Sequence, residues 1–150
     1  IRDRPREVDH VAEVTTVLEA LPVAWKARDA SMWVANFASS SDFTNILGMH
    51  FDDRAANEAR HATLFESIFS NSTLEAEVLD VRILGDDAAV AEVAFRLVGY
   101  ERLPPGVIET EPGELRTRLI TVLERREGRW QIVAAQNTAI LPFAAAPPGA

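Results

Sequence analysis

Apolar residues in the first part of the chain recur at the spacing of α-helices. One stripe predicts an amphipathic helix with a single buried face, and its members are Val11, Val14, Leu18, Leu21 and Trp25. Pro22 lies inside this segment. Because proline removes a hydrogen bond from a helix interior and clashes with the preceding turn, we predict a kink or break near Leu21.

Two more helices are predicted before residue 70, each with an aspartate at its start. Asp29 can cap a short helix over residues 29–39, since its carboxylate can accept hydrogen bonds from the first free amides. Asp52 or Asp53 can cap a third helix over residues 54–69 in the same way.

The segment SDFTNILGMHF (residues 41–51) reads as a strand that ends at Gly48. Alternation of side chains along a strand turns Phe43, Asn45 and Leu47 to one face. A buried amide without a partner costs about 1–3 kcal/mol. Asn45 therefore has an internal partner, faces a wet cavity, or is not buried.

From residue 73 onward apolar and polar positions alternate with the period of β-strands. Four strands are predicted, over residues 73–84, 88–99, 115–126 and 130–143. Segregated helices and strands predict an α+β fold, with helices on one face of an antiparallel sheet. Such a sheet curls, and the resulting cone has an open end that forms a pocket. We expect one domain over residues 1–150, with residues 142–150 as a loose tail.

The composition narrows the possible partners. The formal net charge is −8, which disfavours nucleic acids and anionic membrane surfaces. There is no cysteine, and no apolar run is long enough for a transmembrane helix. The first residues, IRDRPREVDH, lack the apolar core of a signal peptide, so we expect a cytoplasmic protein. The three histidines lie on separate segments, and no zinc or nucleotide motif is present, so we expect no metal and no cofactor.

Three segments carry a resemblance to a known family. They are AWKARDASMWVANFASSSDFTNILG, RAANEARHATLFESIF and GRWQIVAAQNT, and together they cover most of residues 24–138. With the order of elements, they resemble the nuclear-transport-factor-two-like (SnoaL-like, cystatin-like) superfamily and within it the SgcJ/EcaC family, named for proteins of enediyne polyketide biosynthesis. The resemblance implies three helices on the concave face of a curved sheet, a pocket for a hydrophobic polyketide-like molecule, and a homodimer through the sheet.

Three polar residues are candidates for catalysis: His61, Asn45 and Gln136. His61 shares a helical face with Leu64 and Phe65, so it is either a core histidine or a pocket base. Its apolar setting should lower its pKa and favour the neutral form.

Gln136 and Asn137 lie on opposite faces of the last predicted strand. Both cannot point into the cone unless a bulge intervenes. We favour Gln136 as the inward residue, because it shares a face with Trp130 and Ile132, and keep Asn137 as a second candidate for substrate binding.

Aromatic residues are expected to form the pocket walls or the core. The candidates for substrate binding are Trp33, Phe37, Phe43, Phe65 and Phe95, together with Asn137.

The leading hypothesis is a small dimeric pocket protein that binds an enediyne-type polyene or a related hydrophobic intermediate. In assisting a cyclisation, hydrolysis or isomerisation, His61 would move a proton while Asn45 and Gln136 bind a carbonyl or enolate oxygen. One alternative is a non-catalytic dimeric binding or assembly module, whose cavity would be filled by side chains. Another is a steroid-isomerase-like enzyme, which needs a pocket carboxylate such as Asp42 or Glu92. An open cavity of a few hundred Å³ is typical of a ligand site.

Overall fold

The amphipathic stripe forms one helix, α1 (His10–Ala27), in a computed structural model that describes residues 9–145. The helix continues past Pro22 to Ala27, so the expected break is wrong. Leu18 and Leu21 before the proline and Trp25 after it are all buried. Packing of this face against the rest of the fold offsets the hydrogen bond that Pro22 cannot make.

The second helix is shorter than predicted. Helix α2 (Ala30–Trp33) starts at Asp29, whose carboxylate accepts a hydrogen bond from the Met32 amide at 3.0 Å. Strand β1 (Phe37–Thr44) then begins inside the predicted helix, because the backbone there pairs with the last strand, Phe37 lying opposite Ile132. Sheet pairing therefore overrides the local helical pattern.

The predicted strand over residues 41–51 is divided by a turn. Strand β1 ends at Thr44, the chain turns over residues 45–49, and β2 (His50–Phe51) runs back antiparallel to β1. Asn45 and Leu47 therefore lie in a connecting loop and not in a strand.

Helix α3 (Arg54–Phe65) begins at Asp53, whose carboxylate accepts a hydrogen bond from the Ala56 amide at 2.7 Å. The structure thus selects Asp53 as the cap over Asp52. The helix ends at Phe65, earlier than predicted, and residues 66–72 make a series of turns. This helix carries His61 at its inner face.

The remaining strands are long and match the predicted segments closely. They are β3 (Thr73–Leu84), β4 (Ala88–Val98), β5 (Glu114–Arg126) and β6 (Arg129–Ala139). All strands belong to one six-stranded sheet in the order β2-β1-β6-β5-β4-β3. The pairing is antiparallel except between β1 and β6, which are parallel, so the sheet is not purely antiparallel.

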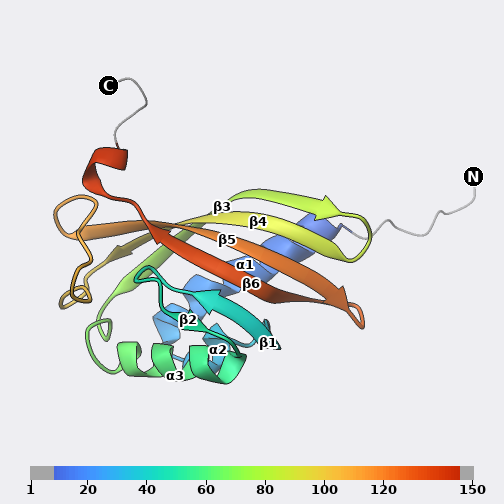
Figure 1. Cartoon of the computed structure of the whole chain (residues 1–150), viewed down its shortest axis with the longest axis horizontal. Coiled ribbons are helices and arrows are strands. Elements are labelled where there is room, and N and C mark those ends of the chain that lie inside the picture. Colours follow the sequence, from blue (N-terminus) through green and yellow to red (C-terminus); the bar gives the residue numbers. More distant parts are fainter. Residues whose placement is uncertain (1–8, 146–150) are drawn as a thin grey trace, which may run out of the picture.

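The sheet is curved and the three helices lie on one side of it (Figure 1). This confirms the predicted α+β, cystatin-like architecture. Strand β5 shows how the faces form, because its residues alternate strictly between buried and exposed from Leu115 to Leu123. Of the predicted loose tail, residues 142–145 form a short 3₁₀ helix, η1 (Pro142–Ala145), and residues 146–150 lie outside the described part.

The cap at the start of α3 gives a testable prediction. Asp53→Ala should lower the free energy of unfolding by about 1 kcal/mol, because the Ala56 amide loses its side-chain partner. Urea denaturation measures the change. Asp52→Ala is the matched control and should change stability by less than about 0.5 kcal/mol, as for other surface positions. Equal losses in the two variants would contradict the assignment of the cap.

Candidate functional site

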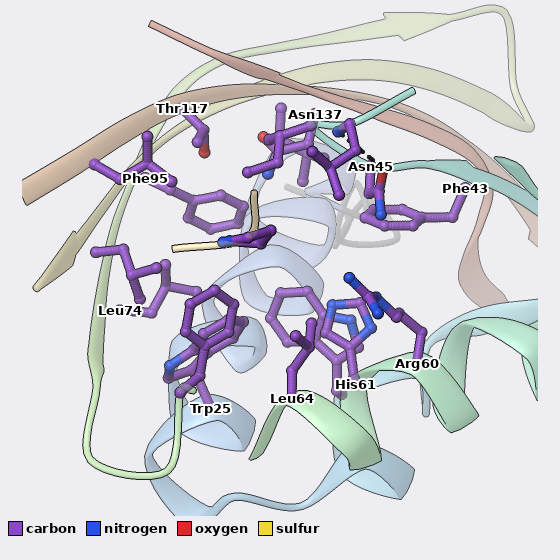
Figure 2. Close-up of a pocket in the computed structure, with 18 residues that line it drawn as sticks. Trp25, Phe43, Asn45, Arg60, His61, Leu64, Leu74, Phe95, Thr117 and Asn137 are labelled. Carbon is purple, nitrogen blue, oxygen red and sulfur yellow. Dashed lines mark hydrogen bonds between the residues drawn. The ribbon is translucent and has the colours of Figure 1, made fainter. Parts of the chain in front are cut away.

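A pocket lies between the helices and the inner face of the sheet. Figure 2 shows the 18 residues that line it. Most are apolar, with rings from Trp25, Trp33, Phe43, Phe69 and Phe95. The polar lining consists of Asn45, Arg60, His61, Thr117 and Asn137. The pocket therefore has an apolar wall interrupted by a few polar groups.

The cavity has a volume of about 80 Å³. This exceeds the roughly 10–15 Å³ that one water requires, so the core is not filled by side chains. It is smaller than the roughly 300–1,000 Å³ of sites that enclose a drug-sized ligand. By the criterion of a few hundred Å³ the cavity is neither a full ligand site nor filled by side chains, and it suits a small group or one end of a longer molecule.

The mouth of the pocket lies where its lining is partly exposed. Leu47 is exposed, and Asn45, Arg60 and Asn137 are partly buried. Trp33, His61 and Thr117 are buried and lie deeper. Polar groups thus occur both at the mouth and inside.

His61 is buried among aromatic rings and also lines the pocket, so it combines features of the two interpretations left open by the sequence. Its ring centroid is 4.8 Å from that of Trp33 and 5.7 Å from that of Phe43. The Nδ1 atom lies 3.0 Å from the Asn57 carbonyl oxygen. Since a carbonyl only accepts hydrogen bonds, Nδ1–H is the donor and Nε2 carries the lone pair.

Burial lowers the pKa of His61 to about 4, the hydrogen bond to the Asn57 carbonyl partly opposes this, and the charge of Arg60 lowers the pKa further. The imidazole is therefore neutral near pH 7. It can accept a hydrogen bond at Nε2, but it is a weak base unless a bound negative charge stabilises the imidazolium.

Asn45 has an internal partner and also reaches the pocket. Its Oδ1 accepts hydrogen bonds from the backbone amides of Leu47 at 3.0 Å and Met49 at 2.9 Å. These bonds hold the turn between β1 and β2. The side-chain NH₂ group is left as a donor at the mouth, so the structural and the pocket interpretations of Asn45 both hold.

The preference for Gln136 as the inward residue is wrong. Val122 of β5 pairs with Ala134 and Leu123 pairs with Ile132, so the register shifts and Val133 is bulged out. An extra residue in a strand reverses which side chains face inward. Gln136 is consequently exposed, and Asn137 lines the pocket (Figure 2).

The predicted wall residues divide into two groups. Trp33, Phe43 and Phe95 line the pocket, whereas Phe37 and Phe65 are buried but lie behind the lining. Both belong to the core, because Phe37 starts β1 and Phe65 ends α3.

Several lining residues were missed by the sequence analysis. Trp25 was assigned only to an apolar stripe, and Phe69 and Arg60 were not considered as site residues. Thr117 could have been identified from the sequence, because it is a polar residue within the inward row of β5 between Leu115 and Leu119.

Four polar atoms of the lining are buried and have no hydrogen-bond partner among residues 9–145. They are Trp33 Nε1, Arg60 Nε, Thr117 Oγ1 and Asn137 Oδ1. An unpaired buried polar atom costs about 1–3 kcal/mol. Such atoms are rare in native proteins, and a functional role or a bound water or ion can account for them.

No carboxylate lines this pocket within the described residues. Asp42 is exposed and lies 2.8 Å from His50 Nε2, and Glu92 pairs in register with the exposed Ile120 on the outer face. Neither turns inward at a bulge, so the steroid-isomerase-like alternative lacks its expected base.

Across residues 9–145, no group of three or more His, Asp or Glu side chains could hold a metal ion. None of the described helices is long and apolar enough to span a membrane.

Solved structures share this architecture. An uncharacterised protein with a cystatin-like fold from Caulobacter vibrioides is 22% identical, with a TM-score of 0.78 over 92% of this chain and 94% of its own. A ketosteroid isomerase-like protein from Erwinia carotovora is 14% identical, with a TM-score of 0.71 over 89% and 98% of the two chains. A protein named after scytalone dehydratase from Novosphingobium aromaticivorans is 8% identical, with a TM-score of 0.70 over 87% and 83%.

The chain therefore has a cystatin-like fold, with a small apolar pocket between helices and sheet. No protein-family model matches the sequence, and no curated protein matches it.

The buried histidine predicts a pH dependence of stability. The folded-state pKa of His61 is about 4, below its usual 6.5, so the unfolded chain binds this proton first as the pH falls. The stabilisation is complete above about pH 6.5 and is lost progressively down to about pH 4, where the loss amounts to about 3 kcal/mol. Urea denaturation at several pH values measures it.

His61→Phe should remove this component and flatten the pH profile of stability relative to the wild type. His50→Phe is the matched control, because the His50 side chain is 52% exposed. It should leave the wild-type profile unchanged. Parallel profiles for the wild type and His61→Phe would contradict the prediction.

Proposed function

We propose that this protein binds a small hydrophobic polyketide-like molecule of natural-product biosynthesis. The observation that carries the proposal is an apolar cavity with four buried polar atoms that have no partner among the described residues. An apolar wall with a few convergent polar groups is the usual composition of a small-molecule site. An unsaturated chain or ring with a carbonyl oxygen matches both components.

The geometry also limits how the molecule lies. The apolar part would contact Trp25, Phe69 and Phe95 in the cavity, and its oxygen would accept hydrogen bonds from Trp33 and Thr117. A longer molecule would leave through the mouth. An adjoining groove of about 360 Å³ provides space there and shares Asn45, Ile46, Leu47 and Asn137 with the pocket.

A reaction in this pocket would use His61 as the proton acceptor. A proton beside a carbonyl would pass to His61 Nε2, and the resulting enolate oxygen would be stabilised by the buried donors Trp33 Nε1–H and Thr117 Oγ1–H. The negative charge would in turn favour the imidazolium. Structural neighbours named for isomerase-like and dehydratase activities support this class of proton transfer.

The low pKa of His61 favours a second function for the same pocket, which is binding without reaction. A base with a pKa of about 4 holds a proton poorly near pH 7. Turnover of an identified substrate would exclude binding without reaction, and turnover by His61→Ala tests the proton-transfer role. Unchanged turnover by this variant would remove the acid–base role of His61 and leave its role in binding.

Ligand binding can be tested with a neutral short polyene, hexa-2,4-dienamide. Titration followed by NMR should shift the resonances of pocket residues at the mouth and on β5. Thr117→Leu should weaken binding at least about tenfold, because it removes a donor and fills part of the cavity. Native mass spectrometry of protein from its natural host should detect a co-purified small molecule.

Thr63→Leu is the matched control for this substitution. Thr63 lies on the exposed face of α3, and its hydroxyl donates to the Ala59 carbonyl of its own helix. This variant should bind hexa-2,4-dienamide as the wild type does. Absence of pocket shifts in the wild type, or equal binding by Thr117→Leu, would contradict the proposed site.

We also propose a homodimer through the outer face of the sheet. Ile120 and Val122 of β5 are 45% and 39% exposed. In register they lie beside outward-facing residues of β4 and β6, with Val90 and Ala134 flanking Val122. Cross-strand apolar side chains on an exposed face can form a contact with the same face of a second copy.

Light scattering should give twice the chain mass for the wild type. The double variant Ile120→Lys, Val122→Lys should give the mass of a monomer. Val23→Lys is the matched control, since Val23 is 58% exposed and lies on helix α1, on the other side of the sheet (Figure 1). A wild-type monomer, or a dimer that survives both substitutions, would contradict this interface.

A further inference from the structure

Arg60 is a cation at the mouth of the pocket with no acidic partner among the described residues. It lies on α3 immediately before His61, and its side chain lines the cavity. Figure 2 shows Arg60 and His61 projecting from the same helix toward Asn45. The Nε atom of Arg60 is buried and makes no hydrogen bond within residues 9–145.

Other partly buried arginines of this chain have partners. Arg28 donates to the carbonyls of Ser70 and Trp25, both at 2.6 Å, and Arg54 donates to the Phe37 carbonyl at 3.2 Å. Arg96 lies 2.6 Å from Glu114 and 2.8 Å from Glu75. Against this background, the lack of a partner distinguishes Arg60. A partly desolvated cation is normally paired.

The lining supplies more hydrogen-bond donors than acceptors. Donors are available on Arg60, the Asn45 side-chain NH₂, Trp33 and Thr117. Free acceptors are limited to His61 Nε2, Asn137 Oδ1 and the Thr117 hydroxyl oxygen. A group that only accepts hydrogen bonds and carries a negative charge complements this set, and an ionised carboxylate has both properties.

We propose that the ligand is a hydrophobic carboxylic acid, whose carboxylate binds the Arg60 guanidinium at the mouth while its chain, with the oxygen proposed above for Trp33 and Thr117, enters the cavity. The inference rests on the proposed binding function and adds the charge of the ligand. A carboxylate is favoured over a phosphate, because one arginine supplies the only cation of the lining and the chain carries a net charge of −8. The planar fork of arginine can bind both carboxylate oxygens at once.

The test compares an acid and an amide of the same shape, hexa-2,4-dienoate and hexa-2,4-dienamide, by NMR titration near pH 7. The wild type should bind the acid at least about tenfold more tightly than the amide. Arg60→Gln should lose this preference and keep its affinity for the amide within about twofold, because the apolar contacts remain. Arg60→Lys should keep part of the preference, since it retains the charge but not the planar fork.

Arg82→Gln is the matched control. Arg82 is exposed on the edge strand β3, and the substitution removes the same charge from the protein. It should leave the preference for the acid unchanged.

The outcomes separate this inference from the proposed function. Binding of the amide without any preference for the acid would overturn the inference and leave the pocket proposal standing. Equal weakening of acid and amide by Arg60→Gln would also overturn it, because Arg60 would then support the fold and not the charge. Failure of both compounds to bind would overturn both proposals.

Discussion

A cluster of aromatic rings centred on Trp25 holds the helices at a fixed distance from the sheet. The Trp25 ring lies edge-on to Trp33 at 5.5 Å and to Phe65 at 5.0 Å, and its Nε1–H donates to Ser72 Oγ at 2.9 Å. These contacts join all three helices and the turn that leads into β3. Trp25 and Trp33 of this cluster also line the cavity. The cavity is the space left beside this cluster, so the site depends on the packing that stabilises the fold.

Two polar side chains of the cavity come from positions where the regular strand structure is interrupted. The bulge at Val133 turns Asn137 inward, and the turn after β1 places Asn45 at the mouth. The regular helix α3 contributes Arg60 and His61 as neighbours, so a charge acts directly on the imidazole and lowers its pKa. Any group that neutralises Arg60 would make His61 more basic. A charged ligand that binds Arg60 would therefore also change the basicity of His61, because the two residues are adjacent in α3.

The structural neighbours share the fold at identities below 25%, and a fold of this kind supports several chemistries. The content of the cavity limits the chemistry that this chain can support. An imidazole and amides occupy the lining, and no Asp or Glu does so within the described residues. A proton transfer here would lack the fixed negative charge of a carboxylate base. This difference separates the present site from a steroid-isomerase-like arrangement even though the scaffold is the same.

The α+β class, the four long strands and the position of His61 on an apolar helical face follow from local periodicity, because alternation and helical spacing directly encode which face of each element is buried. An aspartate cap before α3 is a local property of the same kind, whereas the choice of Asp53 over Asp52 came from the structure. The choice of Asn137 over Gln136 came only from the tertiary structure, since the bulge depends on how β6 pairs with β5 and β1. The start of β1 at Phe37, inside a helical pattern, depends on the same pairing with β6. Arg60 could be identified as a site residue only from the tertiary structure. The lack of a partner is a property of the whole surrounding structure and not of the helix that carries Arg60.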